Sequence, residues 1–264
     1  NYFLIFSPLS FFYPVMEQKV SGRKDILFLF AMSFLAIFLE KIKFDKQKYV
    51  MIFFITLLTL SHSGFFFYTP FLFLIYLLVN HKTNLKKLSL NLSFIILTTL
   101  FLFITTILNS NIDLNAINKI CESIGSYINS CTENNYIATL NWSLKYEMSL
   151  VDELWNKENY IIFYSIAFLL ALLPLIYALT ISKFENKNFK KINPILILII
   201  LNIITFPIYY IGADYGRYMY ISYISILILY FKSLSIKFIK TDKDFFESFK
   251  LSFKKQFIII LIFL

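Results

Sequence analysis

Long apolar runs, separated by short polar segments rich in lysine, set the hydropathy pattern of this chain. Runs such as 91–108, 160–181 and 194–211 reach or approach the ~20 residues that cross a bilayer as a helix. No segment shows the alternating pattern, about ten residues long, of a transmembrane β-barrel strand. The pattern predicts an all-α fold, a polytopic transmembrane helical bundle of about 7–9 spans.

One apolar run, 49–79, is too long to cross a membrane once. As a single helix it would measure ~46 Å, whereas the hydrocarbon core of a bilayer is ~30 Å thick. Only the segment 61–64, Ser-His-Ser-Gly, interrupts it. We therefore expect two closely spaced spans or one broken helix here, and a kink at Pro174 in a later run.

The composition agrees with a membrane protein. Of the 264 residues, 58% are hydrophobic and only 16% are charged, well below the usual quarter. We expect residues 1–264 to form a single transmembrane domain. Because the chain lacks an initiator Met and is apolar at both ends, we expect a fragment truncated at both ends.

The lysines indicate the orientation of the spans. The net charge of +9 could suggest nucleic-acid binding, but the lysines lie in short segments between apolar runs, so no nucleic-acid partner is expected. Basic segments mark the cytoplasmic side of membrane proteins, here 40–48, 80–90, 182–193 and 232–255. The acidic segment 109–159 is predicted to be a long extracytoplasmic loop subdomain.

Only two of the 25 basic side chains are arginines, a bias that suggests an AT-rich bacterial genome. Alternation of the spans places both arginines on the outer side, where the positive-inside rule disfavours them. Arg217 stands three residues after Asp214, and an arginine fork matches phosphate oxygens. Asp214 could orient Arg217 or act as a base, or the pair could simply brace a tight turn. Tyr215 and Tyr218 could line a binding groove or belong to the aromatic belt.

Two other outer turns carry candidate residues. Arg23 and Lys24 precede an apolar run and could bind phosphate, although anchoring to lipid headgroups explains them equally. His62 interrupts the run 49–79 and could act as a general base, or it could be a polar turn residue.

Cys121 and Cys131 lie in the acidic outer loop, where an oxidising compartment favours a disulfide between them. No further cysteine or histidine accompanies them, so we expect no metal site. Phosphate-binding glycine loops and zinc motifs are also missing from the sequence, and we expect no cofactor.

Three short motifs together resemble the Wzy/EpsG-type membrane polysaccharide polymerases. They are 22–25 (Gly-Arg-Lys-Asp), 61–64 (Ser-His-Ser-Gly) and 214–217 (Asp-Tyr-Gly-Arg), the last beside the cysteine-bearing loop. Lys24 stands where the family typically has glutamine.

The resemblance implies a multi-pass glycosyltransferase of the bacterial inner membrane that extends a surface polysaccharide on a polyprenyl-pyrophosphate carrier at the extracytoplasmic face. Arg23 and Arg217 would stabilise the leaving pyrophosphate, and His62 or Asp214 would take the acceptor proton. Lys24, Tyr215 and Tyr218 would contribute to substrate binding. The partners would be a lipid-linked oligosaccharide and membrane lipids. A transporter or flippase of lipid-linked sugars and a membrane ligase or acyltransferase remain alternatives.

Overall fold

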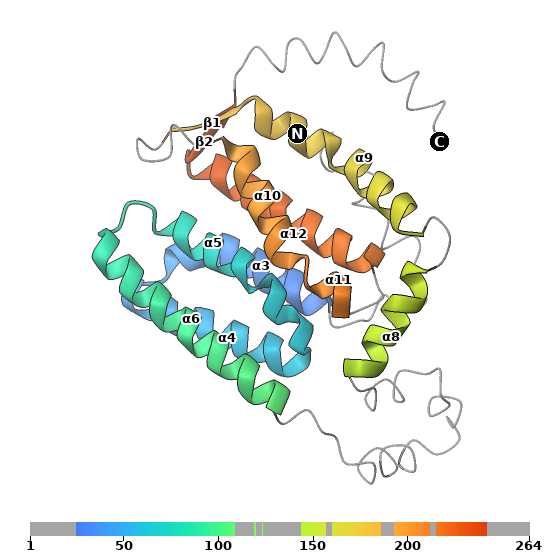
Figure 1. Cartoon of the computed structure of the whole chain (residues 1–264). Helices are drawn as coiled ribbons and strands as arrows, with labels where there is room; N and C mark the ends of the chain where they lie inside the picture. Colours follow the sequence, from blue (N-terminus) through green and yellow to red (C-terminus); the bar gives the residue numbers. More distant parts are fainter. Residues whose placement is uncertain are drawn as a thin grey trace.

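The computed structural model describes residues 25–108, 119, 123, 144–156, 160–185, 193–211 and 215–241 (Figure 1). Most of these residues are helical, as the predicted all-α class requires. The helices, with η for the 3-10 type, are α3 (Asp25–Phe38), η2 (Leu39–Lys41), α4 (Phe44–Ser61), η3 (Ser63–Tyr68), α5 (Thr69–Val79), α6 (Leu85–Leu108), α8 (Leu144–Trp155), α9 (Tyr160–Thr180), α10 (Pro194–Thr205), α11 (Ile208–Ile211) and α12 (Tyr215–Ser235). Two short strands, β1 (Ser182–Phe184) and β2 (Ile239–Thr241), pair antiparallel.

Three of the described helical segments are long and apolar enough to cross a membrane: Leu85–Leu108, Pro194–Ile211 and Tyr215–Ser235. A fourth appears if the two halves of α9 count as one span. They meet at an angle of 42°, and Pro174 lies inside this helix, as expected for a proline kink. The described helices support a membrane protein, while the larger number of spans expected from the sequence stays a prediction.

The apolar run 49–79 breaks at the predicted place. Helix α4 ends at Ser61 and η3 begins at Ser63, with His62 in an extended conformation between them. Pro70 follows at the start of α5, where its missing N–H costs no helical hydrogen bond. The run therefore forms two helical segments joined by a tight turn.

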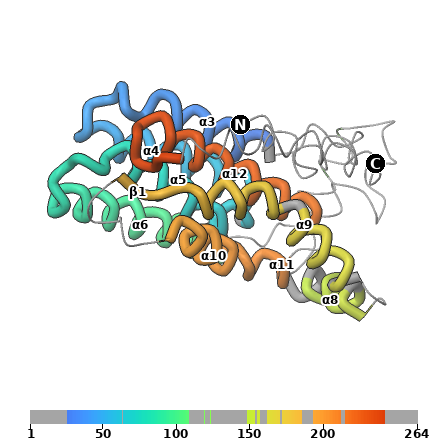
Figure 2. The backbone as a smooth tube through the Cα atoms, turned by 90° about the horizontal axis from the view of Figure 1, so that it is seen from above, coloured from blue at the N-terminus to red at the C-terminus, as the bar shows by residue number. Residues whose placement is uncertain are grey.

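Helix α12 is the centre of the bundle. It packs against α3, α5, α9 and α10, and Figure 2 shows it running between α3 on one side and α9 and α10 on the other. Ser222 and Ser225 are fully buried on this helix, and small residues let neighbouring helices approach closely. In contrast, α6 directs large side chains such as Phe101 outward, as expected for a face that contacts lipid.

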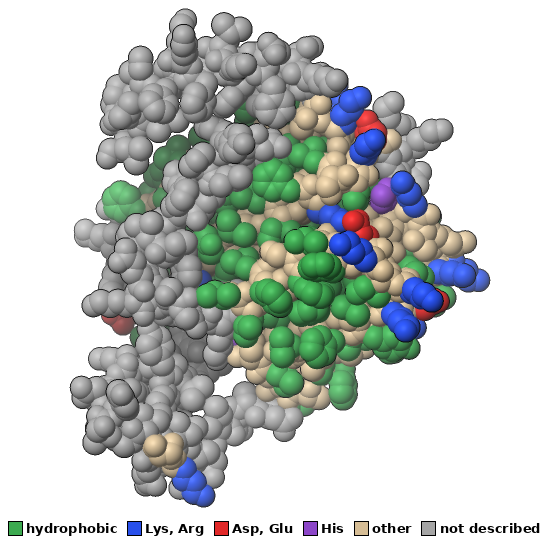
Figure 3. Space-filling model, turned by 180° about the vertical axis from the view of Figure 1, so that it is seen from behind, with side chains coloured by type: hydrophobic (Ala, Val, Ile, Leu, Met, Phe, Trp, Pro, Cys, Tyr) green, Lys and Arg blue, Asp and Glu red, His purple; other side chains and the backbone are tan. Residues whose placement is uncertain are grey.

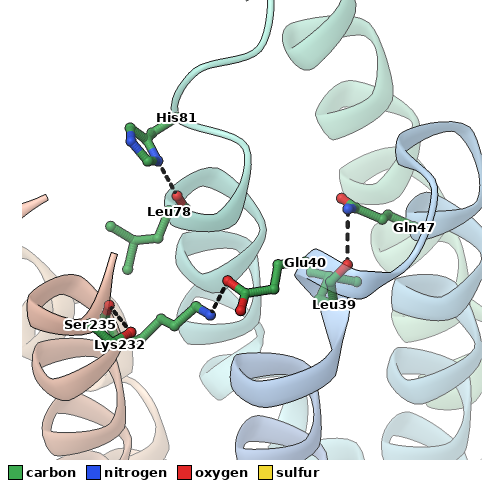
Figure 4. A network of polar contacts seen from close by, with 7 residues as sticks. All are labelled: Leu39, Glu40, Gln47, Leu78, His81, Lys232 and Ser235. Atoms are coloured by element: carbon green, nitrogen blue, oxygen red, sulfur yellow. Dashed lines mark hydrogen bonds and ion pairs between the residues drawn. The ribbon is translucent and has the colours of Figure 1, made fainter. Parts of the chain in front are cut away.

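One end of the bundle is held together by polar contacts. The Nζ of Lys232 on α12 lies 2.7 Å from the Oε2 of Glu40 in η2 (Figure 4). Gln47 donates to the carbonyl of Leu39 at 2.9 Å and accepts from Asn80 at 2.6 Å, which joins α4 to η2 and to the end of α5.

The strand pair β1–β2 lies at this same end, because the His81 ring that follows α5 packs edge-on against Phe238. Most described lysines lie in these elements or in the turns next to them, and Figure 3 shows most of the basic side chains along the right-hand side of that view. We call this the lysine-rich end. The sequence predicted a loop at 182–193 and a loop or an amphipathic surface helix at 232–255, so the strand pair was not predicted.

Candidate functional site

The structure describes four of the predicted site residues: His62, Arg217, Tyr215 and Tyr218. The others lie outside the described residues: Arg23, Lys24, Asp214, Cys121 and Cys131. In the sequence, Arg23 and Lys24 come just before α3, which begins at Asp25, and Asp214 comes just before α12, which begins at Tyr215.

Arg217 lies in the first turn of α12, not in the loop between two spans, where the sequence analysis placed it. The glycine at 216 disfavours helix by its intrinsic preference, but burial of Tyr215, Tyr218 and Met219 favours an ordered helix start. The first turn of an α-helix presents backbone N–H groups and a partial positive charge, both of which attract anions. The helix start therefore adds a second attraction for an anion beside the guanidinium of Arg217.

The ring of Tyr218 supports the guanidinium of Arg217. The guanidinium carbon lies 5.2 Å from the ring centroid, within the range of a cation–π contact. Its Nη2 also approaches the Tyr218 hydroxyl at 3.5 Å. Because Tyr218 itself is buried, it fixes the position of the Arg217 charge.

The imidazole of His62 is held by the backbone of its own turn. Its Nδ1 accepts a hydrogen bond from the N–H of Gly64 at 2.9 Å. A backbone N–H can only donate, so Nδ1 keeps its lone pair and the proton of the neutral ring is on Nε2. This tautomer presents a donor, which suits contact with an anion better than the general-base role expected from the sequence.

Gly64 is required for that arrangement. A Cβ at this position would come within 2.9 Å of the His62 Cε1 and 3.0 Å of its Nδ1. It would lie 3.6 Å from the Cδ1 of Ile208 on α11, so the same turn is packed against the segment that precedes Arg217.

Three separate parts of the chain meet at this end of the bundle. The hydroxyl of Tyr68, at the end of η3, donates to the backbone carbonyl of Tyr218 at 3.3 Å. The ring of Phe28, one turn into α3, lies 5.7 Å from that of Phe65 and 5.4 Å from that of Tyr68. The start of α3, the His62 turn and the start of α12 are thus adjacent, and we call this the arginine end.

Tyr68 also brings the His62 turn within electrostatic reach of Arg217. Its hydroxyl bonds to the backbone of Tyr218, the residue next to Arg217, and the ring of Tyr209 lies 5.7 Å from the ring of Tyr218. Ser222, one turn further along α12, is fully buried. No pattern in the sequence singled out Tyr68, since it is one of 18 tyrosines.

Helix α8 covers the start of α12 from the side. The indole N–H of Trp155 donates to the hydroxyl of Tyr215, and the Trp155 ring lies 4.7 Å from that of Tyr210. Tyr164 on α9 also packs edge-on against Tyr215 at 5.9 Å. Tyr215 is therefore a buried residue that joins α8, α9 and α12, and its contact with a substrate stays a prediction.

Within the part of the chain that the structure describes, no group of three His, Cys, Asp or Glu residues could hold a metal ion. Comparisons of the chain with protein-family models, with curated proteins and with solved structures found no match. The resemblance to polysaccharide polymerases consequently stays a prediction that rests on the three motifs.

Proposed function

We propose that this chain belongs to a glycan polymerase, a glycosyltransferase that extends a surface polysaccharide on a polyprenyl-pyrophosphate carrier. It would act at the extracytoplasmic face of a bacterial inner membrane, as a multi-pass protein of about 7–9 spans. The observation that carries the proposal is the meeting of the His62 turn with the Arg217 helix start, linked through Tyr68 and Tyr218. This anion-attracting group lies at the end of the bundle away from the lysine-rich end, which the positive-inside rule assigns to the cytoplasm.

In the proposed reaction, an acceptor sugar hydroxyl attacks the anomeric carbon of the donor chain. The bond from that carbon to the pyrophosphate oxygen breaks, and its electron pair leaves with the lipid pyrophosphate. Arg217 and the N–H groups of the α12 start would stabilise the charge that develops on this leaving group. Arg23 and Lys24, which precede α3 in the sequence, would bind the same pyrophosphate.

The proton of the acceptor hydroxyl needs a base. Since Nδ1 of His62 already accepts the Gly64 N–H, we assign the base role to Asp214, which immediately precedes α12. His62 would donate from Nε2 to a pyrophosphate oxygen. Tyr218 would hold the Arg217 guanidinium, and Tyr215 would hold the start of α12.

Complementation tests the proposal. Cells that lack the gene are expected to carry glycan of a single repeat unit, and the wild-type gene should restore long chains. The variant Arg217→Ala should leave single units at normal protein level, whereas Lys86→Ala, an exposed lysine at the other end, should restore long chains. Long chains with Arg217→Ala would contradict the assigned role.

Reconstitution separates the alternatives. Purified protein in vesicles that contain lipid-linked oligosaccharide should produce polymer without an added acceptor. Movement of the intact lipid across the bilayer would indicate a flippase. Transfer to a different acceptor would indicate a ligase or acyltransferase. Either of these two outcomes in place of polymer would contradict the polymerase proposal.

A further inference from the structure

The seam between α4 and α6 carries a lysine without an acidic partner. Helices α4 and α6 pack side by side, and both begin at the lysine-rich end. Lys48, one turn into α4, is partly buried. Its Nζ lies 5.1 Å from the ring centroid of Tyr49 and 5.8 Å from that of Phe94 on α6. None of the ion pairs between described side chains includes Lys48, so its positive charge lies against two aromatic rings and no carboxylate.

The outer surface on both sides of this seam is apolar. On α6 the large side chains that are at least half exposed include Leu90, Phe94, Leu97 and Phe101. On α4 they include Tyr49, Phe53 and Leu60. Helix α6 is also one of the described helices that are long and apolar enough to cross a membrane. An exposed apolar face of this extent suits contact with lipid chains.

Lys48 lies at the depth where a phospholipid carries its phosphate. Phe94 lies one turn inside the apolar run 91–108. The Lys48 ammonium, which reaches the Phe94 ring, therefore lies near the level where lipid headgroups meet the hydrocarbon core. A charge at this depth is costly unless it is paired. The lipid phosphate is the anion that a phospholipid bilayer presents at this level.

The residues around the seam keep a positive charge. The first two turns of α4 and the first turn of α6 contain one acid, Asp45, and four lysines: Lys46, Lys48, Lys86 and Lys87. Four lysines against one carboxylate leave a net charge of +3. Lys87 is exposed and lies seven residues before Phe94, so both are on the same side of α6. The seam thus combines a basic end with an apolar face.

We propose that the seam between α4 and α6 binds an anionic phospholipid, whose phosphate contacts Lys48 and Lys87. Its acyl chains lie along the outward apolar side chains of α6, among them Phe94 and Phe101. The uncompensated lysines and the exposed apolar face match the two parts of such a lipid. This site belongs to the lysine-rich end, so it is separate from the arginine end and does not depend on the polymerase proposal.

Native mass spectrometry of the purified protein tests the proposal, with phosphatidylglycerol and phosphatidylcholine of identical acyl chains as probes. Wild-type protein should bind phosphatidylglycerol more tightly than phosphatidylcholine. A basic residue near a membrane surface contributes about fivefold to binding of an anionic lipid, so Lys48→Gln should weaken phosphatidylglycerol binding by about that factor. Binding of phosphatidylcholine should not change. Lys48→Arg should keep the preference, because a guanidinium keeps the charge and also stacks on aromatic rings.

Two further variants separate the charge of the site from the packing of the seam. Lys87→Gln removes an exposed charge and should also weaken phosphatidylglycerol binding about fivefold. The double variant Lys183→Gln/Lys240→Gln removes two exposed charges from the strand pair, which packs against α9, α10 and α12. This control should leave the lipid preference unchanged. An excess of inorganic phosphate should not displace the lipid, because phosphate has no chains to cover the apolar face.

Four results would overturn the proposal. The first is equal binding of the two lipids by the wild-type protein. The second is unchanged phosphatidylglycerol binding in both Lys48→Gln and Lys87→Gln. The third is an equal loss in the strand-pair control, which would indicate a diffuse basic surface only. The fourth is displacement of the lipid by inorganic phosphate, which would indicate a site for a soluble anion.

Discussion

The hydroxyl of Tyr68 donates a hydrogen bond to the backbone carbonyl of Tyr218, 3.3 Å away and 150 positions along the chain. This contact joins the segment that follows His62 to the first turn of α12, which carries Arg217. Tyr68 is almost fully buried, so the bond is formed away from water. It is the most direct described link between the two candidate residues.

Removing that hydroxyl should therefore weaken both stability and activity. Tyr68→Phe is expected to cost about 1 kcal/mol of unfolding free energy, since it deletes one buried hydrogen bond. Polymer yield should fall further than this loss of stability explains, because the His62 turn loses its tie to α12. Thermal unfolding and a glycan chain-length assay measure the two effects.

Tyr76→Phe is the matched control for this change. Tyr76 is equally buried, but among the residues that the structure describes its hydroxyl forms no hydrogen bond comparable to that of Tyr68. Loss of that hydroxyl should leave stability unchanged or raise it slightly, with normal chain length. Equal losses in the two variants would show that the Tyr68 contact has no special importance.

Gly64→Ala should disrupt the His62 turn. The added methyl group would meet the imidazole at 2.9 Å, so the ring must move and the hydrogen bond from the Gly64 N–H is lost. We expect a destabilisation of about 1–3 kcal/mol, typical of overpacking, and a strong loss of polymer. Ser61→Ala is the control, since among the described residues the Ser61 hydroxyl bonds only to the Leu58 carbonyl of its own helix. Full activity in Gly64→Ala would show that the ring position is unimportant.

Two substitutions at His62 separate the hydrogen bond that Nδ1 accepts from Gly64 from the proposed donation by Nε2. Asparagine is a good cap and can accept the Gly64 N–H, but its short side chain cannot reach the position of Nε2. His62→Asn should therefore unfold at about the wild-type temperature and yield single repeat units. His62→Gln, whose longer amide can donate near the Nε2 position, should retain part of the polymer yield. If His62→Gln is inactive while His62→Asn is active, donation from the Nε2 position of His62 is not needed and the proposed role is contradicted.

At the lysine-rich end, substitutions in the ion pair of Lys232 and Glu40 should change the free energy of unfolding. The Nζ of Lys232 is buried against Glu40, whose side chain is about half exposed. Glu40→Ala would leave the ammonium buried without its partner, at an expected cost of about 3 kcal/mol. Lys232→Met should cost less, since the remaining carboxylate can reach water. The exposed pair of Lys240 and Glu185 should contribute at most about 1 kcal/mol. A larger loss in Lys232→Met than in Glu40→Ala would contradict this ordering.

Much of the bundle follows from the length of the apolar runs. The break at His62 was predictable because 49–79 is too long for one crossing, and the kinked α9 because Pro174 lies inside its run. The start of α12 at Tyr215 was not predictable, because Gly216 beside Arg217 is typical of a turn. The burial of Tyr218, which favours a helix there, appears only in the folded structure. The strand pair was hidden because each strand has only three residues, too few for a visible alternation.

The candidate site was predictable in its residue types and not in its geometry. Rare arginines and a histidine between apolar runs drew attention to Arg217 and His62. The tautomer of His62 depends on the Gly64 N–H, a contact that needs the fold of the turn, and histidine is not among the usual helix-capping residues. Tyr215 and Tyr218 resembled an aromatic belt, whereas they are buried supports of α12 and Arg217.

The central claim is that the arginine end, and not the lysine-rich end, binds the pyrophosphate of the lipid carrier. Titration of purified protein in detergent with undecaprenyl pyrophosphate tests it directly, for wild type, Arg217→Ala and Lys86→Ala. Loss of one charge-assisted contact predicts an affinity about tenfold lower or more for Arg217→Ala and an unchanged affinity for Lys86→Ala. Equal affinity in wild type and Arg217→Ala would contradict the claim.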